Sequence, residues 1–256
     1  MNVPRWALVT GVGRQIGIGA AICRELARVG VSICFSWWTN YDAEIYGGEH
    51  RSWHTGLVDE LEQMGVDAFG IEVDLSDPVP IETAMASVLG RVGMLSILVN
   101  NAAYSTNGGI DEFTADDLDR HYAVNVRGMA LLSQAFVRQW NGGPGGRIVN
   151  MTSGQSQGRM PGELAYAASK GAVEAFTTSL APAVGGRGIT VNAVNPGPTD
   201  TGWMSEELKT ELLPKFPMGR IGGPDDAARL VAFLCSDAAE WITGQVIHSE
   251  GGFWRQ

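Results

Sequence analysis

The sequence predicts an α/β fold: one domain with a doubly wound parallel sheet of about seven strands and helices on both faces. Short apolar runs alternate with amphipathic stretches along all 256 residues, as in repeated strand–helix–strand units. The apolar runs are mostly continuous and rich in Val and Ile, which is typical of strands buried on both faces. There is no internal repeat and no Pro/Ser-rich linker, so we expect a single domain over residues 1–256.

Each predicted strand is a short apolar run, and each predicted helix has apolar residues at helical spacing. The strands are expected at Trp6–Thr10, Ser32–Trp37, Ala68–Val73, Ile97–Asn100, Arg147–Met151, Thr190–Asn195 and Gln245–His248. The helices are expected at Gly19–Val29, Thr55–Met64, Ile81–Gly90, Ala115–Trp140, Leu164–Ala183, Glu206–Leu213 and Asp225–Cys235. This alternation predicts right-handed crossovers between neighbouring strands.

Two long connections interrupt the alternation. Residues 38–54 follow the second strand and hold Gly47, Gly48, His50 and His54, and residues 197–216 follow the sixth strand. Long connections in compact domains are often binding loops, so we predict that residues 197–216 form a lid over a substrate. Plain surface excursions are the alternative for both.

Composition limits the function. The chain carries 18 basic and 28 acidic residues, a formal net charge of −10, which argues against binding to nucleic acids or to anionic membranes. The three cysteines lack metal-ligand spacing and lie among apolar residues, so we expect free thiols, no metal site and a cytoplasmic location. The amino terminus lacks the pattern of a secretory signal, and no apolar run is long enough to span a membrane.

A glycine-rich turn lies between the first strand and the first helix. Residues 11–19 read GVGRQIGIG, and the predicted helix follows at once. Glycines allow the backbone to approach a pyrophosphate, and a helix amino terminus offers unpaired N–H groups to it. In this context the turn predicts a nucleotide site, as in the Rossmann fold, and an ordinary glycine-rich turn is the alternative.

Tyr166 and Lys170 lie four residues apart in a predicted helix, and Ser153 follows the fifth predicted strand. Positions i and i+4 share a helix face, so the ammonium can lie beside the phenol. A nearby positive charge lowers the pKa of a phenol, which makes the pair a candidate general acid and base for a carbonyl and its alcohol. A surface tyrosine beside a solvated lysine is the alternative.

Taken together, the motifs and their order resemble the short-chain dehydrogenase/reductase superfamily, over essentially the whole chain. The motifs are the glycine loop from Thr10 to Gly19, Asp74, the run NNAA at 100–103, Asn125, Ser153, Tyr166 with Lys170, and Pro196-Gly197. Residues 219–224 and 242–247 further resemble members akin to 3-oxoacyl-[acyl-carrier-protein] reductases.

The resemblance implies a role for each matching residue. Tyr166 is the proton donor in reduction, Lys170 lowers its pKa and binds the nicotinamide ribose, Ser153 binds the carbonyl oxygen, and Asn125 holds a water that connects Lys170 to solvent. Asp74 and the backbone of Leu75 contact the adenine. The implied cofactor-binding set is Gly11, Arg14, Gln15, Ile16, Gly17, Ile18, Trp37, Asp74, Leu75, Asn101, Ala102, Ala103, Tyr166, Lys170, Pro196, Gly197, Thr199 and Thr201.

The chain departs from the family pattern in its glycine loop and its NNAG motif. The loop is interpreted as two residues longer than usual, so that Gly17-Ile18-Gly19 begins the helix. A longer loop also resembles the enoyl-reductase branch, but that branch normally spaces its tyrosine and lysine more widely. Ala103 replaces the usual glycine of NNAG, and we expect the extra methyl group to be tolerated.

Cofactor choice rests on the end of the second strand. NAD-specific members carry an acid there, whereas this chain has Trp37 and Trp38, so NADP(H) is favoured over NAD(H). The guanidinium of Arg14 suits a 2′-phosphate, and His50 and Arg51 are further candidates to bind it. Asp42 or Glu44, folded back onto the ribose, would argue for NAD(H) instead.

The predicted reaction is reduction of a small-molecule ketone or aldehyde, or oxidation of the alcohol. The alternatives are an enoyl reductase acting on C=C and a regulator that binds the cofactor without turnover. Apolar residues of the predicted lid, with Met160, are candidates for an apolar pocket or for core filling: Trp203, Met204, Leu212, Leu213, Phe216 and Met218. Basic residues for an acyl-carrier partner are scattered (Arg138, Lys209, Lys215).

The resemblance also implies a homotetramer, or failing that a dimer. The apolar residues expected at its interfaces are Met129, Leu132, Phe136, Phe176, Leu180 and Trp254.

Overall fold

The computed structural model describes residues 5–46 and 53–255 of the 256-residue chain. Its centre is a seven-stranded sheet in the order β3-β2-β1-β4-β5-β6-β7, in which every neighbouring pair is parallel. The strands are β1 (Trp6–Val9), β2 (Ser32–Trp37), β3 (Ala68–Glu72), β4 (Ile97–Asn100), β5 (Gly146–Met151), β6 (Ile189–Asn195) and β7 (Val246–His248). The predicted doubly wound fold is confirmed.

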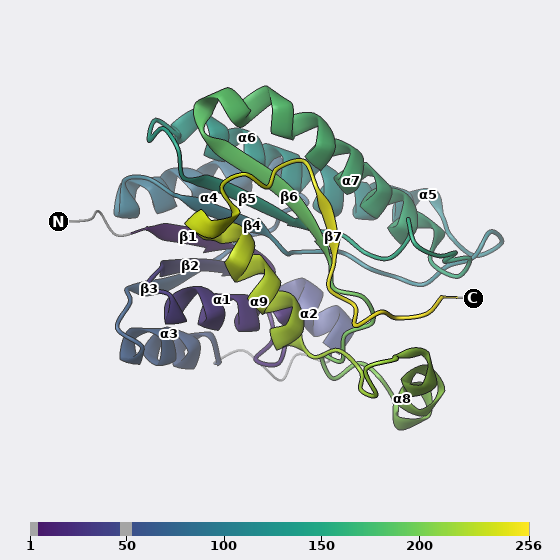
Figure 1. Ribbon diagram of the computed structural model, residues 1–256. Coiled ribbons are helices and arrows are strands. Elements are labelled where there is room, and N and C mark those ends of the chain that lie inside the picture. Colours follow the sequence, from purple (N-terminus) through teal and green to yellow (C-terminus); the bar gives the residue numbers. More distant parts are fainter. Residues whose placement is uncertain (1–4, 47–52, 256) are drawn as a thin grey trace.

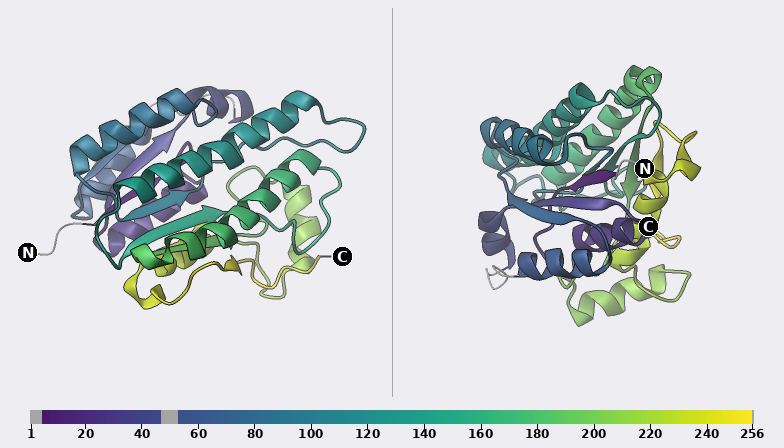
Figure 2. Two further views of the ribbon diagram at one scale, coloured as in Figure 1. Left: turned by 90° about the horizontal axis from the view of Figure 1, so that it is seen from above. Right: turned by 90° about the vertical axis from the view of Figure 1, so that its left-hand side faces the viewer.

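Helices cover both faces of the sheet (Figures 1 and 2). One face carries α4 (Pro78–Val92), α6 (Met129–Gln139) and α7 (Leu164–Val184), whose apolar side chains pack on the strands. The other face carries α1 (Ile18–Arg28), α3 (Trp53–Gln63) and α9 (Pro224–Cys235), and α1 and α9 lie against each other. Strand burial on both sides explains why the apolar runs are continuous rather than alternating.

Three further helices lie near the carboxyl ends of the strands: α2 (Thr39–Tyr46), α5 (Ala115–His121) and α8 (Glu206–Leu212). Strand order reverses between β1 and β4, so the loops after these two strands diverge and leave a crevice. The last described residues lie beyond the carboxyl ends of the strands, whereas β1 begins at the opposite ends of the strands (Figure 1).

Some boundaries differ from the sequence prediction. Residues 38–54 were expected as a connection, but they contain α2 and the start of α3; Gly47, Gly48, His50 and Arg51 lie outside the described residues. The helix expected at Ala115–Trp140 is divided by a wider π-helical turn at Tyr122–Gly128. Helix α4 begins at Pro78 because the side chain of Asp77 accepts a hydrogen bond from Val79 N and caps it.

Three residues expected at a subunit interface are instead part of the core. Met129, Leu132 and Phe136 are 5%, 3% and 0% exposed, because α6 turns these side chains toward the sheet and α4. Phe176 and Leu180 are half-buried and Trp254 is exposed. Within the described residues, no helix is both long and apolar enough to cross a bilayer.

Candidate active site

The crevice at the strand reversal holds a cavity of about 490 Å³. It is lined from the glycine loop, the ends of β2, β3 and β4, helix α2 and the residues around α5. Predicted cofactor residues in its lining are Gly11, Arg14, Gly17, Ile18, Trp37, Asp74, Leu75, Asn101, Ala102, Ala103 and Thr201. The predicted residues outside the lining are Gln15, Ile16, Pro196, Gly197, Thr199, Asn125, Ser153, Tyr166 and Lys170.

Two glycines bring the loop after β1 against the loop after β4. Gly11 has φ +70°, and a Cβ on it would lie 2.5 Å from the Cα of Ala102. A Cβ on Gly19 would lie 2.8 Å from the side-chain nitrogen of Asn101. Asn101 closes the junction, because its side-chain amide donates to the carbonyls of Thr10 and Gly11 at 2.8 and 3.0 Å. Only glycine fits this close approach, so residue type is fixed here by sterics.

The loop register agrees with the longer-loop interpretation. Gly17 is the N-cap of α1, which begins at Ile18, and no side chain caps this helix end in the described part of the chain. The first N–H groups of α1 therefore remain available to an anion, with the positive end of the helix dipole behind them.

Two outside side chains bind the backbone of the long glycine loop, and one side chain of the loop binds a distant residue. Trp53 Nε1 donates to Gly13 O at 2.9 Å, and Arg24 Nη1 donates to Gln15 O at 3.1 Å. Arg14 was predicted to bind a 2′-phosphate. In the structure, its two terminal nitrogens donate to the backbone oxygen and hydroxyl of Thr201, at 2.8 and 2.9 Å. Arg14 thus lines the cavity and links the glycine loop to the predicted lid.

Two acids from α2 line the cavity. Asp42 and Glu44 line it, and the carboxylate of Asp42 lies so close to Gly13 that a Cβ there would be 2.2 Å from Oδ2. Trp37, at the end of β2, stacks on His54 with ring centroids 4.0 Å apart. From the sequence, Asp42 and Glu44 were only alternative ribose contacts. The family pattern places its acid at the end of the second strand, whereas these two acids lie in a helix that was not predicted.

Asp74 and Leu75, which were predicted to contact the adenine, line the cavity together with Ser76. The carboxylate of Asp74 accepts from Ser76 N at 2.8 Å, which fixes this turn. Tyr104 and Arg120, which were missed by the sequence analysis, line the opposite wall, where Arg120 Nη1 donates to the hydroxyl of Tyr104 at 2.9 Å. Their signal was weak, since one arginine in a helix and one tyrosine after NNAA are common surface residues.

Tyr166 and Lys170 share one face of α7, as predicted. Lys170 is 3% exposed, its Nζ donates to Met151 O at 2.8 Å, and this nitrogen is 5.5 Å from the centroid of the Tyr166 ring. Burial lowers the pKa of the Lys170 ammonium to about 8. A buried cation beside a phenol is the arrangement that favours the phenolate, so the solvated-lysine alternative is wrong.

Asn125 lies in the wide turn Tyr122–Gly128, and its side chain is fully buried. Its Oδ1 accepts from Tyr104 N at 2.7 Å, and its Nδ2 donates to Tyr104 O at 2.9 Å and Ser169 Oγ at 2.9 Å. These contacts tie the cavity wall at Tyr104 to α7, the helix that carries Tyr166 and Lys170. The implied water between Asn125 and Lys170 stays a prediction.

His121 connects the cavity wall to Tyr166. It is buried, and its ring lies edge-on to Tyr104 at 4.9 Å and to Tyr166 at 6.2 Å between centroids. Its Nδ1 is 2.6 Å from Asp117 O, and its Nε2 accepts from Thr106 N at 3.2 Å. Burial lowers the pKa of this imidazole, which favours its neutral form.

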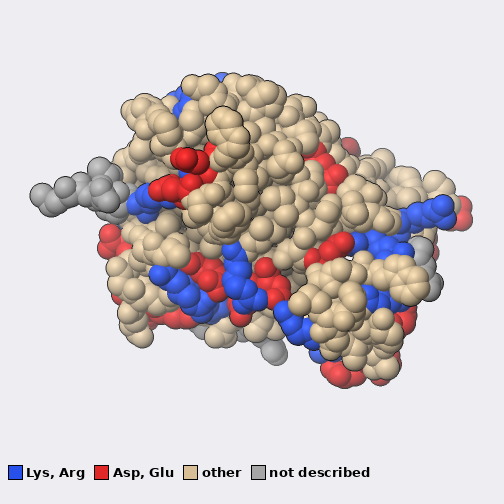
Figure 3. Space-filling view, viewed as in Figure 1, with Lys and Arg blue, Asp and Glu red and all other residues tan. Residues whose placement is uncertain are grey.

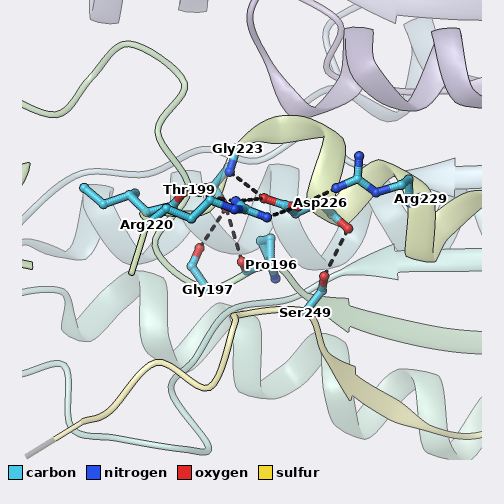
Figure 4. Close-up of polar contacts among 9 residues, drawn as sticks. Pro196, Gly197, Thr199, Arg220, Gly223, Asp226, Arg229 and Ser249 are labelled. Atoms are coloured by element: carbon cyan, nitrogen blue, oxygen red, sulfur yellow. Dashed lines mark hydrogen bonds and ion pairs between the residues drawn. The ribbon is translucent and has the colours of Figure 1, made fainter. Parts of the chain in front are cut away.

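The loop after β6 is fixed by contacts of its own. The Thr199 hydroxyl donates to Pro196 O at 3.2 Å and Gly197 O at 3.1 Å, and Thr199 pairs with Gly222. Asp226 anchors the other side of this pairing, because Arg220 binds its carboxylate through two nitrogens and Gly223 N donates to it (Figure 4). The Arg220 guanidinium, with the Gly223 N–H, holds the pKa of Asp226 down to about 2.

The predicted lid is partly open and partly packed. Trp203 is 53% exposed while its Nε1 donates to Thr199 O at 2.9 Å. Met204 and Phe216 are buried, whereas Leu213 and Met218 are exposed. The core-filling alternative thus holds for Met204 and Phe216, whereas Met160 and Leu212 are half-buried.

The family described as "Enoyl-(Acyl carrier protein) reductase" matches residues 11–254. The chain is a short-chain dehydrogenase/reductase. It is 51% identical to "Uncharacterized oxidoreductase YjdA" of Bacillus subtilis, over 97% of this chain and 96% of that one. It is 34% identical to 3-oxoacyl-[acyl-carrier-protein] reductase FabG of Staphylococcus aureus, over 99% and 100% of the two chains.

Solved structures of this superfamily share the fold over their full length. A metagenomic blue fluorescent protein in complex with NADPH has a TM-score of 0.87 at 36% identity, with 99% of each chain covered. A short-chain dehydrogenase of Burkholderia cenocepacia in complex with NADP has a TM-score of 0.86 at 35% identity, covering 98% of this chain and 99% of that one. The superfamily predicted from the motif order is confirmed.

Proposed function

We propose that the protein is an NAD(P)(H)-dependent carbonyl reductase that converts a ketone or aldehyde to the alcohol, and the reverse. The observation that carries this is the buried Lys170 ammonium beside the Tyr166 ring on α7. Tyr166 donates the proton to the carbonyl oxygen, and Lys170 favours the phenolate that remains. Ser153 supplies a second hydrogen bond to the developing oxyanion.

The cavity suits a dinucleotide. The glycine loop and the uncapped start of α1 fit a pyrophosphate, and Asp74 with Leu75 fits an adenine. The bound nicotinamide supplies the hydride. Two structural relatives hold NADP or NADPH, which supports use of a nicotinamide cofactor by this chain.

We propose NADP(H) as the preferred cofactor. Trp37 at the end of β2 leaves no acid there, and Arg14 and Arg120 both line the cavity. Asp42 opposes this preference, since its carboxylate lies against Gly13. We therefore expect the carboxylate of Asp42 to weaken the preference for NADP(H).

Reduction of a C=C bond is the second candidate reaction, because the matching family carries the name of an enoyl reductase. The Tyr166–Lys170 spacing of one helical turn favours the carbonyl. A regulator without turnover would have no use for a lysine buried at the expense of its hydration.

Titration with NADPH and NADH, followed by quenching of tryptophan fluorescence, tests the cofactor site first. Oxidation of the preferred cofactor is then measured with acetoacetyl-CoA, ethyl acetoacetate, diacetyl and benzaldehyde. Tyr166→Phe is expected to lower kcat by about 10²- to 10⁴-fold and to leave the cofactor Kd nearly unchanged. Wild-type turnover in this variant would contradict the proposed mechanism.

We also propose a homotetramer, or a dimer, in the cytoplasm, with residues 197–216 as the substrate lid. The face over α7 and β7 carries few charges (Figure 3), and Trp241 and Trp254 are 96% and 66% exposed. Sedimentation of the purified protein checks the assembly.

A further inference from the structure

The last residues of the described chain lie against the active-site loops. Arg255 binds Glu250 through both ends of its guanidinium, at 2.8 and 2.7 Å. The two side chains are 16% and 12% exposed. A forked pair of this kind fixes both side chains in one orientation, because two parallel hydrogen bonds join them.

Arg255 packs directly on the loop that begins at Ser153. A Cβ on Gly154 would lie 2.1 Å from Arg255 Nη2, and a Cβ on Gly158 would lie 2.3 Å from Arg255 Cδ. Glycines at both positions therefore let the arginine side chain lie flat against this loop. A shift of Arg255 would therefore change its contact with Gly154, the residue next to Ser153.

Glu250 makes the corresponding contact with the loop after β6. Its Oε2 accepts from Asn195 Nδ2 at 2.9 Å, and a Cβ on Gly197 would lie 2.4 Å from Glu250 Cβ. Gly197 N in turn donates to Asn195 Oδ1 at 2.9 Å. The ion pair thus connects the loop that carries Ser153 with Pro196-Gly197.

Helix α7 holds the Ser153 loop from its other side. Glu174 lies one turn after Lys170, and its Oε1 accepts from Gln155 Nε2 at 2.7 Å and from Thr152 Oγ1 and Ser156 Oγ at 3.2 Å each. Ser153 therefore lies between the catalytic helix and the C-terminal ion pair. Removal of the pair takes away the side-chain support of this loop that lies opposite α7, and leaves the bonds to Glu174 and the backbone bond from Thr152 N to Val194 O.

We propose that Glu250 and Arg255 are positioning residues that hold the Ser153 hydroxyl in place for the carbonyl oxygen. A buried ion pair contributes little net stability compared with an apolar pair of the same size, so stability is a poor explanation for it. Position matters more, because a displacement of about 1 Å can cost about 100-fold in rate. This inference rests on the proposed carbonyl reduction.

The test compares Arg255→Met, Glu250→Gln and the double variant with Arg147→Met. Arg147 is a matched control: it is 3% exposed, bonded to Ser236 O and Gly146 O, and lies at the start of β5, whose other end leads to Ser153. Hydrogen–deuterium exchange of residues 152–158 and kinetics with ethyl acetoacetate and NADPH are measured on the full chain.

Arg255→Met is expected to speed exchange in residues 152–158 about tenfold or more and to lower kcat about 10- to 100-fold, with NADPH Kd within about twofold of wild type. The double variant should be no slower than Arg255→Met, since the pair acts as one unit. Arg147→Met should lower Tm and leave both kcat and this exchange unchanged.

Unchanged exchange and kcat in Arg255→Met would overturn the proposal, as would a loss of Tm without a loss of kcat. The exchange measurement needs no turnover. A wild-type protein that reduces none of the carbonyl probes overturns the proposed function, and faster exchange in Arg255→Met then still reports the support of the loop.

Discussion

The two sides of the crevice are built by different means. On the cofactor side, between β1 and β4, Gly11 and Gly19 bring backbone segments into contact, and Asn101 joins them with amide hydrogen bonds. On the substrate side, after β5 and β6, charged pairs such as Glu250–Arg255 and Asp226–Arg220 hold the loops. The cofactor side therefore depends mainly on close backbone contacts, and the loops of the substrate side depend on ion pairs as well as on glycines.

For cofactor binding, the largest effect is expected from a single methyl group on the cofactor side. Gly11→Ala forces an alanine into φ +70° and against the backbone of Ala102, so the loops must separate. We expect the NADPH Kd to rise by about 10- to 100-fold, measured by fluorescence titration. Gly90→Ala is the control, because a Cβ there meets nothing within 4 Å, and its Kd should equal that of wild type.

The next prediction concerns the effect of pH on stability and rate through Lys170, which is buried on α7 and bonded to Met151 O. Its pKa is about 8 in the folded protein and about 10.4 when unfolded. Below pH 8 the buried ammonium costs stability in full. Between about pH 8 and 10.4 the unfolded chain binds more protons, so this contribution to stability rises with pH.

The same loss of charge removes support for the Tyr166 phenolate. We therefore expect kcat/KM for carbonyl reduction to fall as pH rises through about 8. Over that interval the Tm of wild type should rise relative to Lys170→Met. A rate profile that stays flat to pH 10 would show that the charge on Lys170 has no part in the reaction.

A smaller effect, on the choice between NADPH and NADH, is expected from a change of charge on the cofactor side. Asp42→Asn removes a carboxylate that lies against Gly13, where it opposes a 2′-phosphate. We expect the ratio of NADH Kd to NADPH Kd to increase about tenfold, from titrations of both cofactors. Glu25→Gln, on an ion pair within α1, is the control and should leave the ratio unchanged. An unchanged ratio in Asp42→Asn would mean that Asp42 does not face the ribose.

The smallest effect concerns charge on the substrate side. Asp226 has its pKa lowered to about 2, so it stabilises the fold above its unfolded pKa of about 3.9 and ceases to do so as pH falls through 2. Asp226→Asn should lower Tm by about 2–4 °C at pH 7. The difference from wild type should vanish near pH 2; a constant difference would argue against the charge as its cause.

The sequence predicted most of the fold, because strand burial on both faces leaves continuous apolar runs and because glycine and proline mark the turns. It also predicted the Tyr166–Lys170 pair, since one helical turn brings the two side chains together whatever surrounds them. The sequence also predicted that Gly17-Ile18-Gly19 begins the first helix, and α1 begins at Ile18.

Contacts between distant segments were not predictable in the same way. Helix α2 has no strong apolar periodicity, so a place for Asp42 or Glu44 at the cofactor was only an alternative, and the approach of Asp42 to Gly13 was not predicted. The partner of Arg14, Thr201, lies 187 residues away, and a long cation suits a phosphate equally well. His121, Tyr104 and the Glu250–Arg255 pair depend on tertiary packing that no local spacing reveals.

The central claim is that Tyr166 and Lys170 direct hydride to a carbonyl carbon. The most direct test gives the wild-type protein NADPH deuterated at the transferred position together with α,β-unsaturated aldehydes of increasing size, starting from cinnamaldehyde. Mass spectrometry and NMR of the products then locate the label. We predict deuterium on the carbinol carbon of the allylic alcohol, and none transferred by Tyr166→Phe. Deuterium on the β-carbon of a saturated aldehyde would contradict the account and assign the protein to C=C reduction.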